Sequence, residues 1–220
     1  RIGSITKTFT ATLFMQLVEK DQISLSTKLS AFYPDMPNAD SITMEHLLRH
    51  QSGLHNYTRD SIFGQSENLM RTKQEMLAHF RDTEPEFQPG EQFQYSNTNY
   101  VLLGYILEDI TGKRYPELLQ QRIVQPLGLA RTYFSDSTLR EGEARSFKWT
   151  GRTWKRQGLT HPSVTHGAGG IVSTPSDLVA FYRGLFEGQL VDTQSLNRMT
   201  SMKEGISQKN RYGLGLLQMP

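Results

Sequence analysis

Two short motifs in this sequence combine side chains that can carry out acyl transfer. Ser4 and Lys7 stand three residues apart in Ser4-Ile5-Thr6-Lys7, at the start of a segment with helical periodicity. This spacing puts both side chains on one helix face, a turn apart. A serine hydroxyl is a weak nucleophile until a base takes its proton, and a lysine kept neutral by burial can do so. The pattern also fits a serine that caps a helix carrying a lysine on its surface.

The second motif is Tyr95-Ser96-Asn97, which opens another helical segment. A tyrosine near a lysine cation can be pushed toward phenolate and act as a general base. The asparagine can hydrogen-bond the lysine or a substrate amide. A tyrosine that packs and an asparagine that caps the helix explain the motif locally just as well. Tyr95 begins the only Y-x-N in the chain, and Ser4 begins the only S-x-x-K.

Apolar periodicity and turn residues predict the elements that position these side chains. The first helix is expected from Ser4 to Lys20, with one apolar face. Further helices are expected at 43–50, 72–81, 97–110 and 115–124, with another starting at 173–177. We expect a loop at 84–94, a hairpin around 150–152 with Trp149 and Trp154 packed across it, a glycine turn at 167–170 and a strand at 212–219. A helix-rich α+β chain follows.

The composition is that of an ordinary globular protein, and it excludes several kinds of site. Hydrophobic residues make up 36% and charged residues 21% of the 220 residues. The net charge is +2 with Lys and Arg spread along the chain, which gives no case for nucleic acid or a membrane surface. No apolar run approaches the length of a membrane span. Cysteine is absent, so disulfides, thiolate metal ligands and a cysteine nucleophile are excluded.

With their surroundings, the two motifs resemble the serine β-lactamase and penicillin-binding-protein family, above all class C β-lactamases and their D-aminopeptidase and esterase relatives. The matching stretches keep the family's order and cover essentially the whole chain. They are Arg1-Ile-Gly-Ser-Ile-Thr-Lys7, the H-L-L-x-H-x-S-G-L run at 46–54, Phe87–Gly90, Tyr95–Asn97, Pro126–Leu129, Ala168–Gly170 and Ser173–Leu178. The resemblance implies a β-lactamase/transpeptidase-like fold, with a helical region and part of an antiparallel sheet, in one catalytic domain over residues 1–220.

The resemblance also implies roles for the motif residues. Ser4 would form the acyl-enzyme, Lys7 and Tyr95 would share the proton transfers, and Asn97 would hold Lys7 and the substrate amide. The chain would then be a serine hydrolase acting on a β-lactam, a D-amino-acid peptide or a small ester. No cofactor, metal ion or nucleic-acid partner is implied. Relatives are often exported to the periplasm or anchored in the cell envelope. Neither the oligomeric state nor the compartment follows from this sequence.

The family's third motif, K-T-G or H-x-G, is missing from this chain. None of K-T-G, K-S-G, H-T-G or H-G-G occurs. In the family that motif follows the stretch that Tyr212–Leu216 resembles, and strands also precede the nucleophile helix. We therefore expect a domain truncated at both ends. The alternative is a non-catalytic homologue that binds peptidoglycan fragments or a protein partner.

Histidines and glycines supply the remaining candidates. His46 and His50 lie one helical turn apart, with His55 nearby, but no carboxylate stands where a zinc-protease helix requires one, so we expect no metal site. Gly169 and Gly170 belong to the turn that lies beside the pocket in relatives, and we expect them to contact the substrate. His166, next to that turn, would either touch the substrate or lie in a surface loop.

Overall fold

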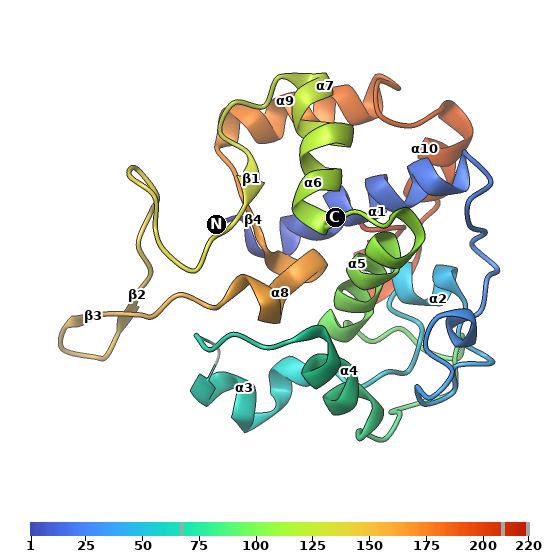
Figure 1. The fold of residues 1–220 in the computed structure, drawn as a ribbon, viewed down its shortest axis with the longest axis horizontal. Helices are drawn as coiled ribbons and strands as arrows, with labels where there is room; N and C mark the ends of the chain where they lie inside the picture. Colours follow the sequence, from blue (N-terminus) through green and yellow to red (C-terminus); the bar gives the residue numbers. More distant parts are fainter. Residues whose placement is uncertain (67, 208–209, 219–220) are drawn as a thin grey trace.

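The structure is a computed structural model that describes residues 1–66, 68–207 and 210–218. Its helices are arranged around a central helix, α1, as Figure 1 shows. Among the described residues the α-helices are α1 (Thr6–Val18), α2 (Met44–Leu48), α3 (Ser61–Ser66), α4 (Lys73–Arg81), α5 (Asn97–Thr111), α6 (Tyr115–Leu119), α7 (Gln125–Leu127), α8 (Pro162–Gly169), α9 (Pro175–Phe186) and α10 (Thr193–Thr200). A π-helical turn, Gln120–Val124, joins α6 to α7.

The strands that the structure describes are short and all pair antiparallel. They are β1 (Tyr133–Phe134), β2 (Phe147–Trp149), β3 (Trp154–Arg156), β4 (Ile171–Val172), β5 (Lys203–Ser207), β6 (Asn210–Tyr212) and β7 (Leu217–Gln218). β1 pairs with β4, β2 with β3, and β5, β6 and β7 form a sheet in that order. The predicted hairpin is confirmed, because Trp149 pairs with Trp154 and their ring centroids lie 5.4 Å apart.

Helix α1 is buried on nearly all sides, whereas the sequence predicted a single apolar face. It packs against α5 and α8, and every residue from Thr6 to Met15 is buried. The threonines on its polar side are satisfied by carbonyl groups: Thr12 Oγ1 donates to Thr8 O at 2.9 Å, and Thr8 Oγ1 donates to Gly215 O at 2.8 Å. A hydrogen-bonded hydroxyl can enter the core without the cost of an unpaired polar group, which is why the polar side could be covered.

Local sequence signals explain where several helices begin or end. Thr43 caps α2 and Thr72 caps α4, each in a capping box closed by the residue three positions on. Thr174 caps α9 by accepting a hydrogen bond from the Asp177 N–H, with proline following at the first helical position. Gly112 ends α5 with φ 65°, a left-handed conformation that glycine adopts without strain. The predicted helices at 43–50, 72–81 and 97–110 are thus confirmed within a few residues.

Two predicted segments differ from the structure. The glycine turn at 167–170 is instead largely the end of α8, with Gly170 as its C-cap. The strand predicted at 212–219 is broken, because Tyr212 ends β6 and a turn containing Gly215, at φ 73°, leads into β7. Residue 219 lies outside the described residues. At Gly215 the glycine gives the backbone a freedom that periodicity does not report.

Candidate active site

The start of the first helix carries the candidate nucleophile. Ser4 lies in the 3-10 turn Gly3–Ile5, immediately before α1, and its side chain is exposed. Gly3 enters the turn with φ 52°, which glycine allows because it has no Cβ. The first N–H groups of a helix have no acceptor within the helix. Ser4 therefore stands at a surface where backbone donors and solvent meet.

Lys7 lies one turn further along, almost completely buried at 1% exposed. Its Nζ lies 3.1 Å from Ser4 Oγ, 2.8 Å from Asn97 Oδ1 and 2.8 Å from the Ala168 carbonyl oxygen. Burial lowers the pKa of the Lys7 ammonium from its ordinary 10.5 to about 7, because the charged form loses its hydration. A large fraction of Lys7 is therefore neutral at neutral pH. The surface lysine considered as an alternative is ruled out.

Tyr95 lies 91 residues further along the chain, and the fold brings its side chain beside Ser4. Its hydroxyl donates to Ser4 Oγ at 2.7 Å, and Lys7 Nζ lies 4.8 Å from the centre of its ring. Burial raises the pKa of Tyr95, and the hydrogen bond to Ser4 only partly offsets this rise. The sequence-based expectation of a tyrosine pushed toward phenolate is therefore wrong in this structure. In this structure Tyr95 is a phenol whose hydroxyl donates to Ser4 Oγ.

Asn97 is the first residue of α5, and its side-chain amide is held on both ends. The oxygen accepts from Lys7, while Nδ2 donates to Asn56 Oδ1 at 3.3 Å and to Thr58 Oγ1 at 3.2 Å. Asn56 Oδ1 also accepts from the Asn97 backbone N–H at 3.0 Å. The segment containing Asn56 and Thr58 thus fixes which end of the amide faces Lys7, a role that no motif in the sequence indicated.

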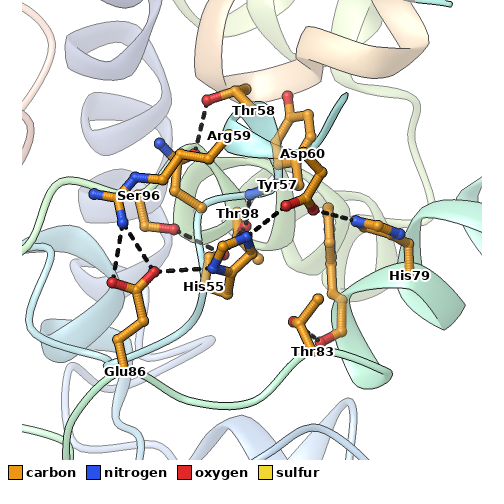
Figure 2. A network of polar contacts seen from close by, with 12 residues as sticks. His55, Tyr57, Thr58, Arg59, Asp60, His79, Thr83, Glu86, Ser96 and Thr98 are labelled. Carbon is orange, nitrogen blue, oxygen red and sulfur yellow. Dashed lines mark hydrogen bonds and ion pairs between the residues drawn. The ribbon is translucent and has the colours of Figure 1, made fainter. Parts of the chain in front are cut away.

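A network of charged side chains braces that segment, as Figure 2 shows. The His55 ring lies between two carboxylates, with Nδ1 3.0 Å from Glu86 Oε1 and Nε2 2.8 Å from Asp60 Oδ1. His79 Nε2 contacts the other Asp60 oxygen at 2.7 Å, and Arg59 Nη1 donates to both oxygens of Glu86. Burial raises the pKa of Asp60, but hydrogen bonds from the two histidines outweigh it and lower that pKa. These side chains are only partly buried.

On the opposite side of Lys7, α8 contains a strained residue. His166 has φ 34° and ψ −129° inside the helix, a conformation that costs a residue with a Cβ about 1–3 kcal/mol. Its ring packs on Tyr105 and Tyr115, with Nε2 3.5 Å from Glu108 Oε1. A Cβ at Gly104 would lie 2.3 Å from His166 Nδ1, so the ring fits only because that residue is glycine.

The kink at His166 turns two successive carbonyl groups toward α1. Gly167 O accepts from Thr10 Oγ1 at 2.6 Å, and Ala168 O accepts from Lys7. The sequence placed His166 either against the substrate or in a surface loop, and both expectations are wrong, since it is 8% exposed and surrounded by aromatic rings. The physical reason is that Gly104 of α5 leaves space for the His166 ring. Sequence periodicity does not reveal this space.

Two pockets share Ser4 in their lining. The larger, of 540 Å³, is mainly apolar and is lined by Ser4, Ile5, Lys7, Thr8, Tyr95, Tyr182, Phe186, Tyr212, Gly215, Leu216 and Leu217. The smaller, of 170 Å³, includes Thr58, Asn97, Thr165 and Gly169. Gly170 is not part of either lining, because it packs against Phe134, whose ring a Cβ would approach to 2.4 Å. Of the two glycines predicted to contact substrate, the structure brings only Gly169 to the site.

His50 packs beside Tyr95, although the sequence assigned it only to a structural helix. It is fully buried, its ring lies 4.4 Å from that of Tyr95, and its Nδ1 accepts from the Ser96 backbone N–H at 3.2 Å. Burial, with a further contribution from the Lys7 charge, lowers the pKa of His50 well below its ordinary value. A neutral imidazole therefore supports the Tyr95 ring. The sole sequence signal was its place in the H-L-L-x-H-x-S-G-L run.

The other histidines of that region are engaged in local structure. His46 closes the capping box of α2, its Nδ1 accepting from the Thr43 N–H at 3.3 Å. His55 belongs to the carboxylate network. Over the residues that the structure describes, no group of histidines, cysteines and carboxylates has the arrangement of a metal site. Likewise, no helix in those residues is long and apolar enough to cross a bilayer.

Known proteins are similar to this chain in both sequence and fold. The family model described as Beta-lactamase matches residues 1–219. A D-stereospecific amidohydrolase from Streptomyces sp. is 33% identical with a TM-score of 0.90, over 100% of this chain and 70% of that one. A penicillin binding protein from Bacillus halodurans is 25% identical with a TM-score of 0.89, over 100% of this chain and 69% of that one.

Among curated proteins, a teichoic acid D-alanine hydrolase of Staphylococcus aureus (strain MRSA252) is 30% identical over 182 residues, or 80% of this chain and 43% of that protein. The chain spans about half the length of the curated relatives it matches, 53% and 43% for two of them. The match of the family model along the chain and the likeness in fold agree with the motifs of the sequence. The chain belongs to the beta-lactamase family of serine hydrolases and has the β-lactamase/transpeptidase fold.

Proposed function

We propose that this chain carries the nucleophile of a serine acyl hydrolase and forms an acyl-enzyme at Ser4. The observation that carries the proposal is the position of Ser4 Oγ, 3.1 Å from a buried lysine amine and 2.7 Å from a phenol. A serine with a base and a proton donor both within hydrogen-bond reach is the arrangement that nucleophilic catalysis requires.

Lys7 has the geometry of a general base. A neutral amine has two N–H bonds and one lone pair. Asn97 Oδ1 and the Ala168 carbonyl oxygen accept those two N–H bonds at 2.8 Å each, so the lone pair is left for the Ser4 hydroxyl. With a pKa of about 7, Lys7 is available in this form at neutral pH and can take the proton as Ser4 attacks the substrate carbonyl.

Tyr95 is suited to act as the acid in the same step. Its raised pKa keeps the phenol protonated, and its hydroxyl lies beside Ser4 Oγ, where the leaving group of a tetrahedral intermediate departs. The leaving group takes the Tyr95 proton, and the proton held on Lys7 restores the phenol. Over the acylation step one proton passes from Ser4 to the leaving group. Water then hydrolyses the ester at Ser4.

The substrate class we propose is an amide or ester of a D-amino acid. The support is the activity of similar proteins, a D-stereospecific amidohydrolase and a teichoic acid D-alanine hydrolase. The small pocket beside Ser4, lined partly by Thr58, Thr165 and Gly169, has room for a small polar group. A β-lactam is a cyclic amide that the same machinery would open, so it is the alternative substrate.

The proposal is tested by measuring the intact mass of the whole protein after incubation with a fluorophosphonate and, separately, with penicillin. We expect a mass gain that disappears in Ser4→Ala and persists in Ser137→Ala, a matched change at an exposed serine. The same samples are assayed on D-alanine and L-alanine anilides, with faster release expected from the D form.

The outcomes separate the alternatives. A gain with penicillin that needs Ser4 assigns the protein to the penicillin-reactive members. A gain with the fluorophosphonate alone favours an amidase or esterase. An adduct that still forms in Ser4→Ala contradicts the assignment of Ser4 as the nucleophile. If neither reagent forms an adduct, the result favours a non-catalytic homologue that binds ligands in the same pockets.

A further inference from the structure

A two-stranded hairpin extends away from the helical body, as Figure 1 shows at β2 and β3. All six residues of these two strands are exposed. Phe147 pairs with Arg156, Lys148 with Lys155, and Trp149 with Trp154. Isolated two-stranded hairpins are marginally stable in water. The side chains of this hairpin therefore indicate what kind of partner could stabilise it.

The hairpin displays aromatic rings on one face. Residues two apart on a strand share a face, as do residues directly opposite each other on a paired strand. Phe147 and Trp149 therefore lie on the same face as Trp154. These side chains are 51%, 51% and 64% exposed. The contact between the two tryptophans stabilises the hairpin, but each of these residues still exposes half or more of its surface to solvent.

The same segment carries a concentration of positive charge. Arg145, Lys148, Arg152, Lys155 and Arg156 fall within it, and no Asp or Glu occurs from residue 144 to residue 176. In the part of the chain that the structure describes, none of these five cations forms an ion pair. The net charge of +2 over the whole chain conceals this local excess of positive charge.

The pairing of Lys148 with Lys155 is unfavourable in the free protein. Like charges directly opposite each other across two strands destabilise a hairpin. An anion between or beside the two ammonium groups would remove that repulsion. The charges thus call for an anionic partner, and the exposed aromatic face calls for a partner that takes rings out of water.

We propose that this hairpin docks on an anionic phospholipid bilayer. Tryptophan and basic residues are favoured together at the membrane interface, where rings enter the headgroup region and cations meet lipid phosphates. The long lysine side chains reach the phosphates from the opposite face of the hairpin. A soluble polyanion would neutralise the charges and leave the rings in water, so the bilayer accounts for both features.

Docking in this way would hold the candidate active site close to the bilayer. The chain passes from β3 through residues 157–161 directly into α8. The end of α8 supplies Ala168, which contacts Lys7, and Gly169, which lines the small pocket beside Ser4. This inference does not depend on the reaction proposed for Ser4.

Tryptophan fluorescence tests the proposal directly, because Trp149 and Trp154 are the two tryptophans of this chain. The protein is titrated with vesicles of phosphatidylglycerol and, separately, of phosphatidylcholine. We expect a saturable blue shift with phosphatidylglycerol that about 0.5 M NaCl weakens by screening, and no shift with phosphatidylcholine. Lys148→Glu/Lys155→Glu should weaken binding about tenfold or more, since each basic residue near the surface contributes several-fold.

The charge-matched control is Lys20→Glu/Lys28→Glu, which alters two exposed lysines outside the hairpin and should bind like the unmodified protein. Trp149→Ser/Trp154→Ser, followed by vesicle co-sedimentation, should also bind weakly. No blue shift with phosphatidylglycerol, or equal shifts with both lipids, would overturn the proposal. Binding to soluble polyphosphate without binding to vesicles would overturn it too. Hydrolysis of a small soluble substrate should be unaffected by the hairpin changes.

Discussion

The two sides of the candidate site are held by different forces. On the side of α8, Lys7 and His166 are almost completely buried, and the Ala168 carbonyl is aimed by a strained backbone inside a packed core. On the other side, Asn97 is aimed by Asn56 and a loop pinned by half-exposed ion pairs around His55. Packing positions Lys7, and charge positions Asn97.

The difference indicates how each side responds to its surroundings. Buried contacts are insensitive to salt, and breaking one leaves unsatisfied groups in the core. Partly exposed ion pairs contribute little individually and are screened by salt. Changes on the lysine side should therefore have large effects on the reaction, and changes on the loop side should have small effects that depend on salt and pH.

The largest expected effect comes from Lys7→Met, which keeps the apolar volume and removes the amine. Acylation should slow by about 10²–10⁴-fold, the usual contribution of general base assistance. The variant should lose activity but gain stability, because it no longer buries an amine. Because burial lowers the pKa of Lys7 from 10.5 to about 7, the unfolded chain binds more protons between those values, and stability rises with pH there.

Urea unfolding at pH 7 and pH 9 measures the second effect. The free energy of unfolding should increase with pH in the unmodified protein and increase less in Lys7→Met, with Lys20→Met as an exposed control. Equal pH dependence in the two proteins would show that Lys7 is not the group that titrates.

Tyr95→Phe should also slow acylation, and the double variant Lys7→Met/Tyr95→Phe should lose little more than either single one, because the pair acts as a unit.

An intermediate effect is expected at His166, which we treat as a positioning residue. His166→Gly removes the ring that holds the kink, so the Ala168 carbonyl should shift away from Lys7 and turnover should fall between about tenfold and a hundredfold. Loss of that acceptor disfavours the ammonium form of Lys7, and the acid limb of kcat/KM should move to lower pH. Rate profiles over pH 5–9 measure the shift.

His166→Ala provides the comparison, because alanine keeps a Cβ in a conformation that glycine tolerates. It should be less stable than His166→Gly by about 1–3 kcal/mol, the cost of such strain. An unchanged acid limb in both variants, with only stability reduced, would mean that His166 has no part in positioning the lysine.

The smallest effect is expected on the loop side. Glu86→Gln removes the carboxylate that contacts His55 and Arg59, and kcat/KM should fall only about two- to fivefold, as for other exposed pairs. About 1 M NaCl should reduce the gap between the variant and the unmodified protein. Asp136→Asn, in a separate exposed ion pair with Arg140, is the control. A loss as large as that of Lys7→Met would contradict the comparison between the two sides.

Acid should weaken the same loop. The pKa of Asp60 is lowered in the folded protein, so its contribution to stability is complete above its ordinary pKa and is lost as the pH falls through the lowered one. The groups that hydrogen-bond Lys7 are a hydroxyl, an amide oxygen and a carbonyl oxygen, and these contacts should persist over that range.

Much of the helical framework could be predicted because its signals are local. Threonine caps, a glycine stop and apolar periodicity lie within one segment, and they marked α2, α4 and α5 within a few residues. The kink at His166 could not be predicted, because it depends on Gly104 and Glu108 of another helix. The full burial of α1 was missed for the same reason, since helices far along the chain cover its polar side.

The sequence by itself determined the pair of motifs, their order and the family to which the chain belongs. Those are properties of residue identity and spacing. Only the tertiary structure decided that burial lowers the pKa of Lys7 to about 7, that Tyr95 stays a phenol, and that Asn97 turns its oxygen to the lysine. Each of these depends on desolvation or on partners from distant segments, and such contacts exist only once the chain has folded.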